Sequence, residues 1–292
     1  MGLLLLRAPN AASSLASMKI VITGATAGIG LGCVRAFCAD GHSVIGIARS
    51  EQTLKDLESE IESFRGIPCD IADAASVSTL SSRIADAAGD QTIDVLINNA
   101  GYGAAGPVEL VTIDEWKAQF DVNVFGTVAV TQVLLPFLRN STRGRIVNVS
   151  SVAGRVYVPF FAPYYSSKHA LECISDVLRM EVRDQGIEVV LVEPGAVQTG
   201  FQNHEDAMLE RYASQSELYR NSIGRVVAWH KALAAEGIQP ETVVETIQEA
   251  VCVNRPKTRY VVPKLPPLAF IALTKVLPSR VADNLVKRII KL

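Results

Sequence analysis

The chain has 292 residues, of which 49% are hydrophobic and 20% are charged, and its net charge is −2. This apolar content can fill a large core and argues against a disordered chain. The lack of a positive excess argues against nucleic acid as a partner. The five cysteines form no CxxC pair. This argues against a disulfide framework or a metal site and favours a reducing, cytoplasmic compartment.

The first 17 residues are predicted to form an extension that precedes the folded domain. Residues 3–6 are an apolar block of leucines, and an Ala- and Ser-rich stretch with Arg7 and no acid follows. The block is too short for a secretory signal. An unstructured leader is expected, and a mitochondrial presequence is the alternative.

A regular alternation of strands and helices begins at Met18. Short apolar runs at residues 19–23, 43–48, 93–97, 145–149 and 187–192 read as strands, and the longer segments between them have a helical period. Strands that are apolar on nearly every residue are typical of a parallel sheet with helices on both faces. We therefore expect one α/β domain over residues 18–262, a doubly wound sheet of the Rossmann type. Its last helix is expected at 241–252 and its last strand at 259–262.

A glycine-rich turn follows the first predicted strand. The sequence from Thr23 to Gly30 reads TGATAGIG and leads into a helix. Glycines at such a point let the backbone approach a pyrophosphate at a helix N-terminus. The spacing is neither GxGxxG nor that of a P-loop, so an ordinary turn is the alternative. The position between a strand and a helix favours a dinucleotide site.

The end of the second predicted strand bears on the choice of dinucleotide. An acid at this point would bind the 2′-hydroxyl of NAD(H), whereas a base would accept the 2′-phosphate of NADP(H). This chain has Arg49 and Ser50 there, and a guanidinium pairs well with phosphate oxygens. NADP(H) is therefore the expected cofactor, and Glu51 leaves NAD(H) as the alternative.

A tyrosine and a lysine four residues apart are the candidate catalytic groups. Tyr164 and Lys168 would share one face of a helix, and the ammonium would stabilise the phenolate and lower the pKa of the phenol. Such a tyrosine can exchange the proton that accompanies hydride transfer. Ser151 follows the strand at 145–149, at the sheet edge where α/β folds collect ligands, so its hydroxyl can donate to a substrate carbonyl.

Together these motifs resemble those of the short-chain dehydrogenase/reductases, over about residues 19–262. The resemblance implies a catalytic tetrad in which Ser151 orients the substrate oxygen and Tyr164 exchanges its proton. Lys168 would lower the pKa of Tyr164 and hold the nicotinamide ribose, while Asn123 would support a proton-relaying water. The matching residues are the TGx3GxG turn, Asp70, Asn98-Asn99-Ala100-Gly101, Asn123, Ser151, Tyr164-x3-Lys168 and Pro194-Gly195 followed by Thr199.

The same resemblance assigns the cofactor residues. It implies that Asp70 contacts adenine, Asn99 the adenine ribose region, and Thr199 the nicotinamide amide or the phosphates. Members that prefer NADP often carry a second base before the middle glycine, where this chain has Ala27, so the NADP(H) expectation depends on Arg49 alone. The expected cofactor residues are Thr23, Gly24, Thr26, Gly28, Ile29, Gly30, Arg49, Ser50, Asp70, Asn99, Ala100, Gly101, Tyr164, Lys168, Pro194, Gly195, Val197 and Thr199.

Within the family, residues 150–155, 159–163 and 192–195 look most like the branch near retinol, 17β-hydroxysteroid and 3-hydroxybutyrate dehydrogenases. This implies an NADP(H)-dependent oxidoreductase for an apolar alcohol or ketone, such as a steroid, a retinoid or a lipid-derived carbonyl. An NAD(H)-dependent hydroxyacyl or 3-hydroxybutyrate-type dehydrogenase is one alternative, and a dinucleotide-binding regulator without chemistry is another. The resemblance also implies a homodimer or homotetramer.

Two segments depart from the alternation. Residues 199–240 are polar and irregular, and we expect them to form a substrate-binding excursion whose aromatic side chains line an apolar pocket or pack in the core. Residues 263–292 form a basic, apolar C-terminal arm. Residues 257–292 carry eight basic side chains and one acidic side chain, a net charge of +7 that leaves −9 for the rest. Such an arm can lie on an anionic membrane surface. The alternative is an arm folded over the substrate cleft or a partner subunit.

Overall fold

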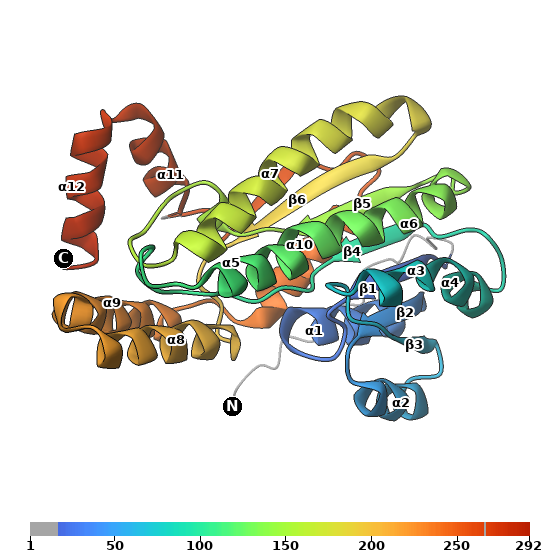
Figure 1. Ribbon diagram of the computed structural model, residues 1–292. Helices are drawn as coiled ribbons and strands as arrows, with labels where there is room; N and C mark the ends of the chain where they lie inside the picture. Colours follow the sequence, from blue (N-terminus) through green and yellow to red (C-terminus); the bar gives the residue numbers. More distant parts are fainter. Residues whose placement is uncertain (1–16, 266) are drawn as a thin grey trace, which may run out of the picture.

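Seven parallel strands form the centre of the molecule. The computed structural model describes residues 17–265 and 267–292. Its sheet has the order β3-β2-β1-β4-β5-β6-β7 (Figure 1). The strands are β1 (Lys19–Thr23), β2 (Ser43–Ala48), β3 (Phe64–Pro68), β4 (Val95–Asn98), β5 (Arg145–Val149), β6 (Glu188–Pro194) and β7 (Arg259–Val262). The strand order reverses between β1 and β4, the point at which doubly wound sheets bind ligands. The predicted fold class is confirmed. The N-terminal leader or presequence predicted over residues 1–17 lies almost wholly outside the described residues and stays a prediction.

Helices cover both faces of the sheet. On one face, α1 (Gly28–Ala39) and α10 (Pro240–Cys252) pack Phe37 and Ile247 against the strands. On the other face, α4 (Leu80–Ala88), α6 (Thr127–Arg139) and α7 (Ala162–Val182) bury side chains such as Ile84 and Phe137. The short helices α2 (Glu51–Glu60) and α3 (Ala74–Ser78) follow β2 and β3. The apolar pattern of the strands thus reflects burial on two faces.

The strand β3 was not among the runs that the apolar pattern predicted. Arg65, Gly66 and Pro68 interrupt its apolar character. It pairs with β2 alone, and an edge strand tolerates a proline because it has one side without ladder hydrogen bonds. The predicted strands at 19–23, 43–48, 145–149 and 259–262 have the observed bounds, and the two others differ by one or two residues at their ends.

One continuous helical stretch runs across the sheet on the face of α4. It consists of α5 (Ile113–Phe120), a π-helix η1 (Asp121–Gly126) and α6. Among the described residues this stretch, Ile113–Arg139, is long and apolar enough to span a membrane by length and composition. Its apolar character has a local explanation, because Val130, Leu134 and Phe137 are buried against the sheet.

The prediction that residues 199–240 are irregular was wrong. They form two helices, α8 (Phe201–Gln215) and α9 (Glu217–Ala235), which lie side by side at one end of the molecule (Figure 1). Their inner faces join a third apolar cluster through residues such as Leu209 and Ile223. The C-terminal arm contributes α11 (Pro267–Val276) and α12 (Ser279–Ile289), and α12 places Val286 in the same cluster. The arm therefore packs on this helical lobe with one face.

Candidate active site

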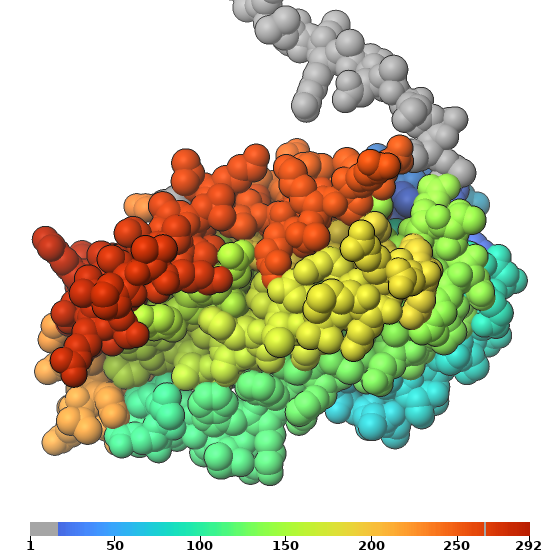
Figure 2. All heavy atoms as spheres, turned by 90° about the horizontal axis from the view of Figure 1, so that it is seen from above, coloured from blue at the N-terminus to red at the C-terminus, as the bar shows by residue number. Residues whose placement is uncertain are grey.

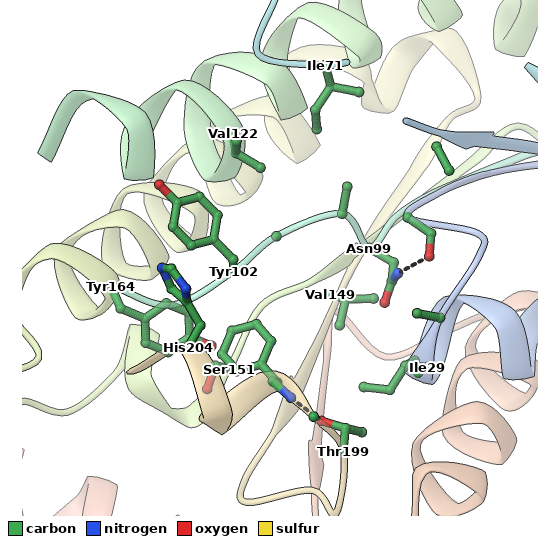
Figure 3. A pocket seen from close by; sticks show the side chains of 18 of the residues that line it. Ile29, Ile71, Asn99, Tyr102, Val122, Val149, Ser151, Tyr164, Thr199 and His204 are labelled. Carbon is green, nitrogen blue, oxygen red and sulfur yellow. Dashed lines mark hydrogen bonds between the residues drawn. The ribbon is translucent and has the colours of Figure 1, made fainter. Parts of the chain in front are cut away.

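A cavity of about 1070 Å³ lies at the carboxyl ends of the strands (Figure 3). This volume exceeds what one small ligand needs, so it can accommodate an extended cofactor together with a substrate. The structure brings most of the predicted site residues to its wall. These are Gly24, Thr26, Gly28, Ile29, Arg49, Asp70, Asn99, Ala100, Gly101, Ser151, Tyr164, Lys168, Pro194, Gly195, Val197 and Thr199.

Four predicted site residues lie outside the wall of the cavity. The Thr23 hydroxyl accepts hydrogen bonds from the backbone N–H groups of Asn99 and Ala100, at 3.0 Å each, and so joins the ends of β1 and β4. Ser50 caps α2 by accepting from the Thr53 N–H. Gly30 lies in the first turn of α1, packed against the Gly24 carbonyl. The fourth residue, Asn123, is buried next to Gly101 of the wall.

The glycine-rich turn has the geometry that an anion site needs. Gly24 and Gly28 have φ angles of +69° and +51°, a region that glycine enters without strain. The Asn99 amide donates to the backbone oxygens of Thr23 (3.0 Å) and Gly24 (3.3 Å), which braces the turn. At the start of α1, Ala27 offers no side-chain cap and the first turn holds no acid. The first N–H groups of α1 are thus left for a ligand, and the turn fits the pyrophosphate of a dinucleotide.

Helix α7 presents the candidate acid/base pair. Pro163 stands in its first turn, where proline favours helix initiation, and this sets Tyr164 one turn before Lys168. Both side chains are buried. The Lys168 ammonium donates to the Val149 carbonyl at 2.9 Å and lies 5.9 Å from the centre of the Tyr164 ring. Ser151 follows β5 and donates to the Pro194 carbonyl at 3.3 Å.

The electrostatics of this pair differ from the prediction. Burial lowers the pKa of Lys168 to about 8, and Glu172 opposes this shift. The pKa of Tyr164 is raised, first by burial and then by the charge of Glu205, while a hydrogen bond with Ser151 lowers it. The desolvation of the phenol therefore outweighs any stabilisation of its phenolate by the nearby ammonium.

Asn123 lies in the π-helix η1, which interrupts the helical stretch beside the site. Its amide nitrogen donates to the Ser167 hydroxyl (3.1 Å) and to the Tyr102 carbonyl (3.0 Å), and its oxygen accepts from the Tyr102 N–H (3.2 Å). It therefore joins the loop after β4 to α7, next to Lys168. Such π-helical insertions are frequent at functional sites. The proton-relaying water that the resemblance assigns to Asn123 stays a prediction.

Three further residues line the end of the cavity near Tyr164. Phe201 is one of the aromatic side chains of residues 199–240 that were expected to line a pocket or pack in the core, whereas sequence reasoning missed Tyr102 and His204. Tyr102 and His204 meet edge to face (Figure 3), with ring centres 5.3 Å apart. The Phe201 ring lies 5.4 Å from the Tyr164 ring. Tyr102 directly follows the Asn-Asn-Ala-Gly match but belongs to no motif. Phe201 and His204 stand at the start of α8, so recognition of that helix would have placed them.

A buried carboxyl group lies behind this end of the cavity. Glu205 on α8 is 3% exposed, and a Cβ atom on Gly103 would lie 2.2 Å from its Oε1 atom. Its Oε2 lies 3.4 Å from the His230 Nε2, and the other nitrogen of that ring lies 2.8 Å from Asp206. Burial, together with the charge of Asp206, raises the pKa of Glu205 to about 8. The protonated form of Glu205 is thus favoured in the folded chain.

This raised pKa predicts that Glu205 makes stability fall as the pH rises. The unfolded chain releases the Glu205 proton above its ordinary pKa of 4.5, whereas the folded chain retains it up to a pH of about 8. The free energy of unfolding should therefore decrease with rising pH between these values. In Glu205→Gln this decrease should be smaller by more than 1 kcal/mol, since one pKa unit corresponds to about 1.4 kcal/mol. Urea denaturation at both ends of the interval measures it.

The matched control is Glu210→Gln, because Glu210 lies on the same helix and is exposed. This control should keep the pH dependence of the unsubstituted chain. If Glu205→Gln and Glu210→Gln show the same pH dependence, Glu205 is not the group responsible.

The fold and the site together define a dinucleotide-dependent oxidoreductase with a tyrosine and a lysine at its centre, and comparison with known proteins agrees. Residues 18–210 match the family model described as short chain dehydrogenase. The chain therefore belongs to the short-chain dehydrogenase/reductase family and is an NAD(P)-dependent oxidoreductase.

Individual relatives match over most of their length. A probable short-chain type dehydrogenase/reductase, VdlC, of Helicobacter pylori is 33% identical over 92% of this chain and 97% of its own. An NADPH-dependent 3-dehydrocapnine reductase of Ornithobacterium rhinotracheale is 34% identical over 91% and 94%. Among solved structures, a short-chain dehydrogenase from Streptomyces avermitilis superposes with a TM-score of 0.76 at 26% identity, covering 93% of this chain and 96% of the other.

Proposed function

We propose that the chain is an NADP(H)-dependent oxidoreductase that transfers a hydride between nicotinamide and an apolar alcohol or ketone. Steroids, retinoids and lipid-derived carbonyls are the candidate substrates. The observation that carries this proposal is that Ser151 and Tyr164 share one end of the cavity with the ring of Tyr102 (Figure 3). The Phe201 ring lies there too, 5.4 Å from the Tyr164 ring. Aromatic walls with few polar groups are typical of sites for apolar ligands.

In the proposed reaction the bound nicotinamide supplies or accepts the hydride. Ser151 donates a hydrogen bond to the substrate oxygen, and Tyr164 gives that oxygen its proton during reduction or removes it during oxidation. Lys168, whose pKa is lowered to about 8, places a positive charge beside Tyr164 while it is protonated. Asn123 fixes the loop after β4 against α7. The glycine-rich turn and the first N–H groups of α1 would hold the pyrophosphate.

The preference for NADP(H) is supported by the charges at the end of β2. Arg49 lies in the wall of the cavity and forms no ion pair with another described residue. Glu51, the residue that kept NAD(H) as an alternative, pairs with Lys55 at 2.7 Å. The name of the Ornithobacterium relative states that it is NADPH-dependent. A guanidinium without a protein partner is suited to a 2′-phosphate.

Replacing Arg49 by serine should raise the KM for NADPH by roughly ten- to a hundredfold, because a hydrogen bond to a charged group contributes about 1.5–3 kcal/mol. The KM for NADH should hardly change, since NADH carries no 2′-phosphate. Steady-state kinetics with both cofactors measure the effect. Lys55→Ser on the neighbouring helix is the control and should leave both constants unchanged. A loss that is equal for NADPH and NADH would refute the assignment of Arg49.

The substrate class is tested by turnover of steroid, retinoid, acyl and small ketones with NADPH and NADH in parallel. Tight NADPH binding without turnover of any carbonyl would support a regulator instead. The homodimer or homotetramer implied by the family stays a prediction, which sedimentation of the purified chain tests.

A further inference from the structure

Helix α11 is apolar on two opposite faces. Its inner face buries Ile271, which is 3% exposed, and packs Phe270 against the cluster formed by α8, α9 and α12. Its outer face carries apolar side chains that the described part of the chain leaves uncovered. They recur at every third or fourth position, so they lie along one side of the helix and its N-terminal approach. We call this surface the outer stripe; it consists of Leu265, Leu268, Ala269, Ala272, Leu273 and Val276.

The outer stripe is strongly exposed for an apolar surface. Leu265 is 71% exposed, and Val276 is 83% exposed. Of the fourteen large apolar side chains exposed among the described residues, six lie between 265 and 289, which is less than a tenth of the chain. Single exposed apolar residues are ordinary, whereas a contiguous group of them marks an interaction surface. Figure 2 shows the arm, in orange-red and red, as a continuous part of the molecular surface beside α7.

The arm that carries the outer stripe is rich in exposed basic side chains. Asp283 is the one acid of the arm. No base of the arm forms an ion pair with another described residue. The bases are Lys264, Lys275, Arg280, Lys287, Arg288 and Lys291. The arm is thus positive, while residues 1–256 carry a net charge of −9.

This distribution of charge indicates which kind of partner binds the outer stripe. A second copy packed arm against arm would bring these bases together, which is unfavourable. An anionic membrane surface attracts the arm and repels the acidic body, so it would orient the molecule with α11 toward the lipid. We propose that the outer stripe and the bases of the arm dock the enzyme on an anionic membrane, with α11 lying in the interface.

The root of the arm lies against the active-site cavity. A Cβ atom on Gly195, a residue of the cavity wall, would lie 3.5 Å from Pro263 and 3.7 Å from Pro267. Docking through α11 therefore brings this wall of the cavity close to the lipid bilayer, in which apolar carbonyl compounds dissolve. The docking proposal stands on the stripe and its charge, and it does not depend on which substrate is turned over.

The experiment is co-sedimentation of the full chain with vesicles of phosphatidylcholine, with and without phosphatidylserine. The chain should bind the anionic vesicles at least about tenfold more strongly than the neutral ones, and added salt should weaken this binding. The triple variant Leu268→Glu, Leu273→Glu and Val276→Glu should reduce binding to anionic vesicles by about tenfold or more. It should keep turnover of a water-soluble carbonyl, because these side chains are exposed and lie outside the cavity wall.

Met180→Glu is the matched control, because Met180 is 68% exposed on α7 and lies outside the arm. It should bind vesicles as the unsubstituted chain does. The proposal is overturned if the chain binds neither kind of vesicle, or if the triple variant binds as well as the control. It is also overturned if the triple variant changes the oligomeric state instead of vesicle binding, since the stripe is then a subunit interface.

Discussion

Replacing Tyr164 by phenylalanine is expected to lower the turnover of every accepted carbonyl by roughly 10²- to 10⁴-fold, the range that general acid–base catalysis contributes. The phenylalanine ring keeps the packing against Phe201 but can neither give nor take the proton. Binding of NADPH should therefore change little. Steady-state turnover and a fluorescence titration with NADPH separate the two effects.

Tyr165→Phe is the control for this experiment. Tyr165 is the next residue on α7 and packs against Phe161, with ring centres 5.9 Å apart. It lies outside the wall of the cavity. This variant should retain nearly full turnover. Equal activity of Tyr164→Phe and the unsubstituted chain would show that another group transfers the proton.

The substitution Gly30→Ala is expected to disrupt the dinucleotide site. The added Cβ atom would lie 2.1 Å from the Gly24 carbonyl oxygen and 2.6 Å from the Asn99 amide nitrogen. The turn cannot easily yield, because the Gly24 N–H donates to the Ile47 carbonyl at 2.8 Å and Asn99 holds the turn from the other side. We expect a loss of about 1–3 kcal/mol in the free energy of unfolding, and a loss of most NADPH affinity. Urea denaturation and cofactor titration measure both.

Gly224→Ala provides the matched control for the glycine substitution. Gly224 is exposed in the interior of α9, and a Cβ atom there would meet no atom within 4 Å. Alanine is the better helix former, so this variant should gain up to about 1 kcal/mol in the free energy of unfolding. It should bind NADPH normally. The steric explanation is wrong if Gly30→Ala leaves both stability and affinity intact.

The sheet was predictable because its strands are buried on both faces. Runs such as residues 43–48 are then nearly continuous in apolar character. The ends of the strands at 145–149 and 93–97 also locate Ser151 and the Asn-Asn-Ala-Gly match. The apolar pattern did not predict the edge strand β3, because the edge of a sheet tolerates residues such as Arg65 and Pro68 that interrupt an apolar run. The candidate acid/base pair could be predicted because its spacing is local, whereas the pKa of Tyr164 depends on burial and on Glu205, which lies 41 positions away.

The helices α8 and α9 were missed although a helical signal was present. Residues 205, 208, 209 and 212 have the spacing of one buried face, but the first of them is a glutamate. A carboxyl group on an otherwise apolar face interrupts the helical pattern of apolar residues. Only the fold shows that Gly103 leaves space for it and that His230 lies beside it. Tyr102 and His204 were missed for a related reason, since no short motif connects them to Tyr164.

Because α5 and α6 are joined by a π-helix, the number of residues in this segment determines how α6 is oriented relative to Asn123. Each residue of an α-helix turns the chain by about 100°. A deletion within Asp121–Gly126 would therefore either rotate Leu134 and Phe137 away from the sheet or draw Asn123 away from Ser167. A substitution by a residue of similar size keeps both α6 and Asn123 in place, whereas an insertion or a deletion must displace one of them. Insertions and deletions are thus far more costly here than in the surface loops, even though the segment looks like ordinary helix in the sequence.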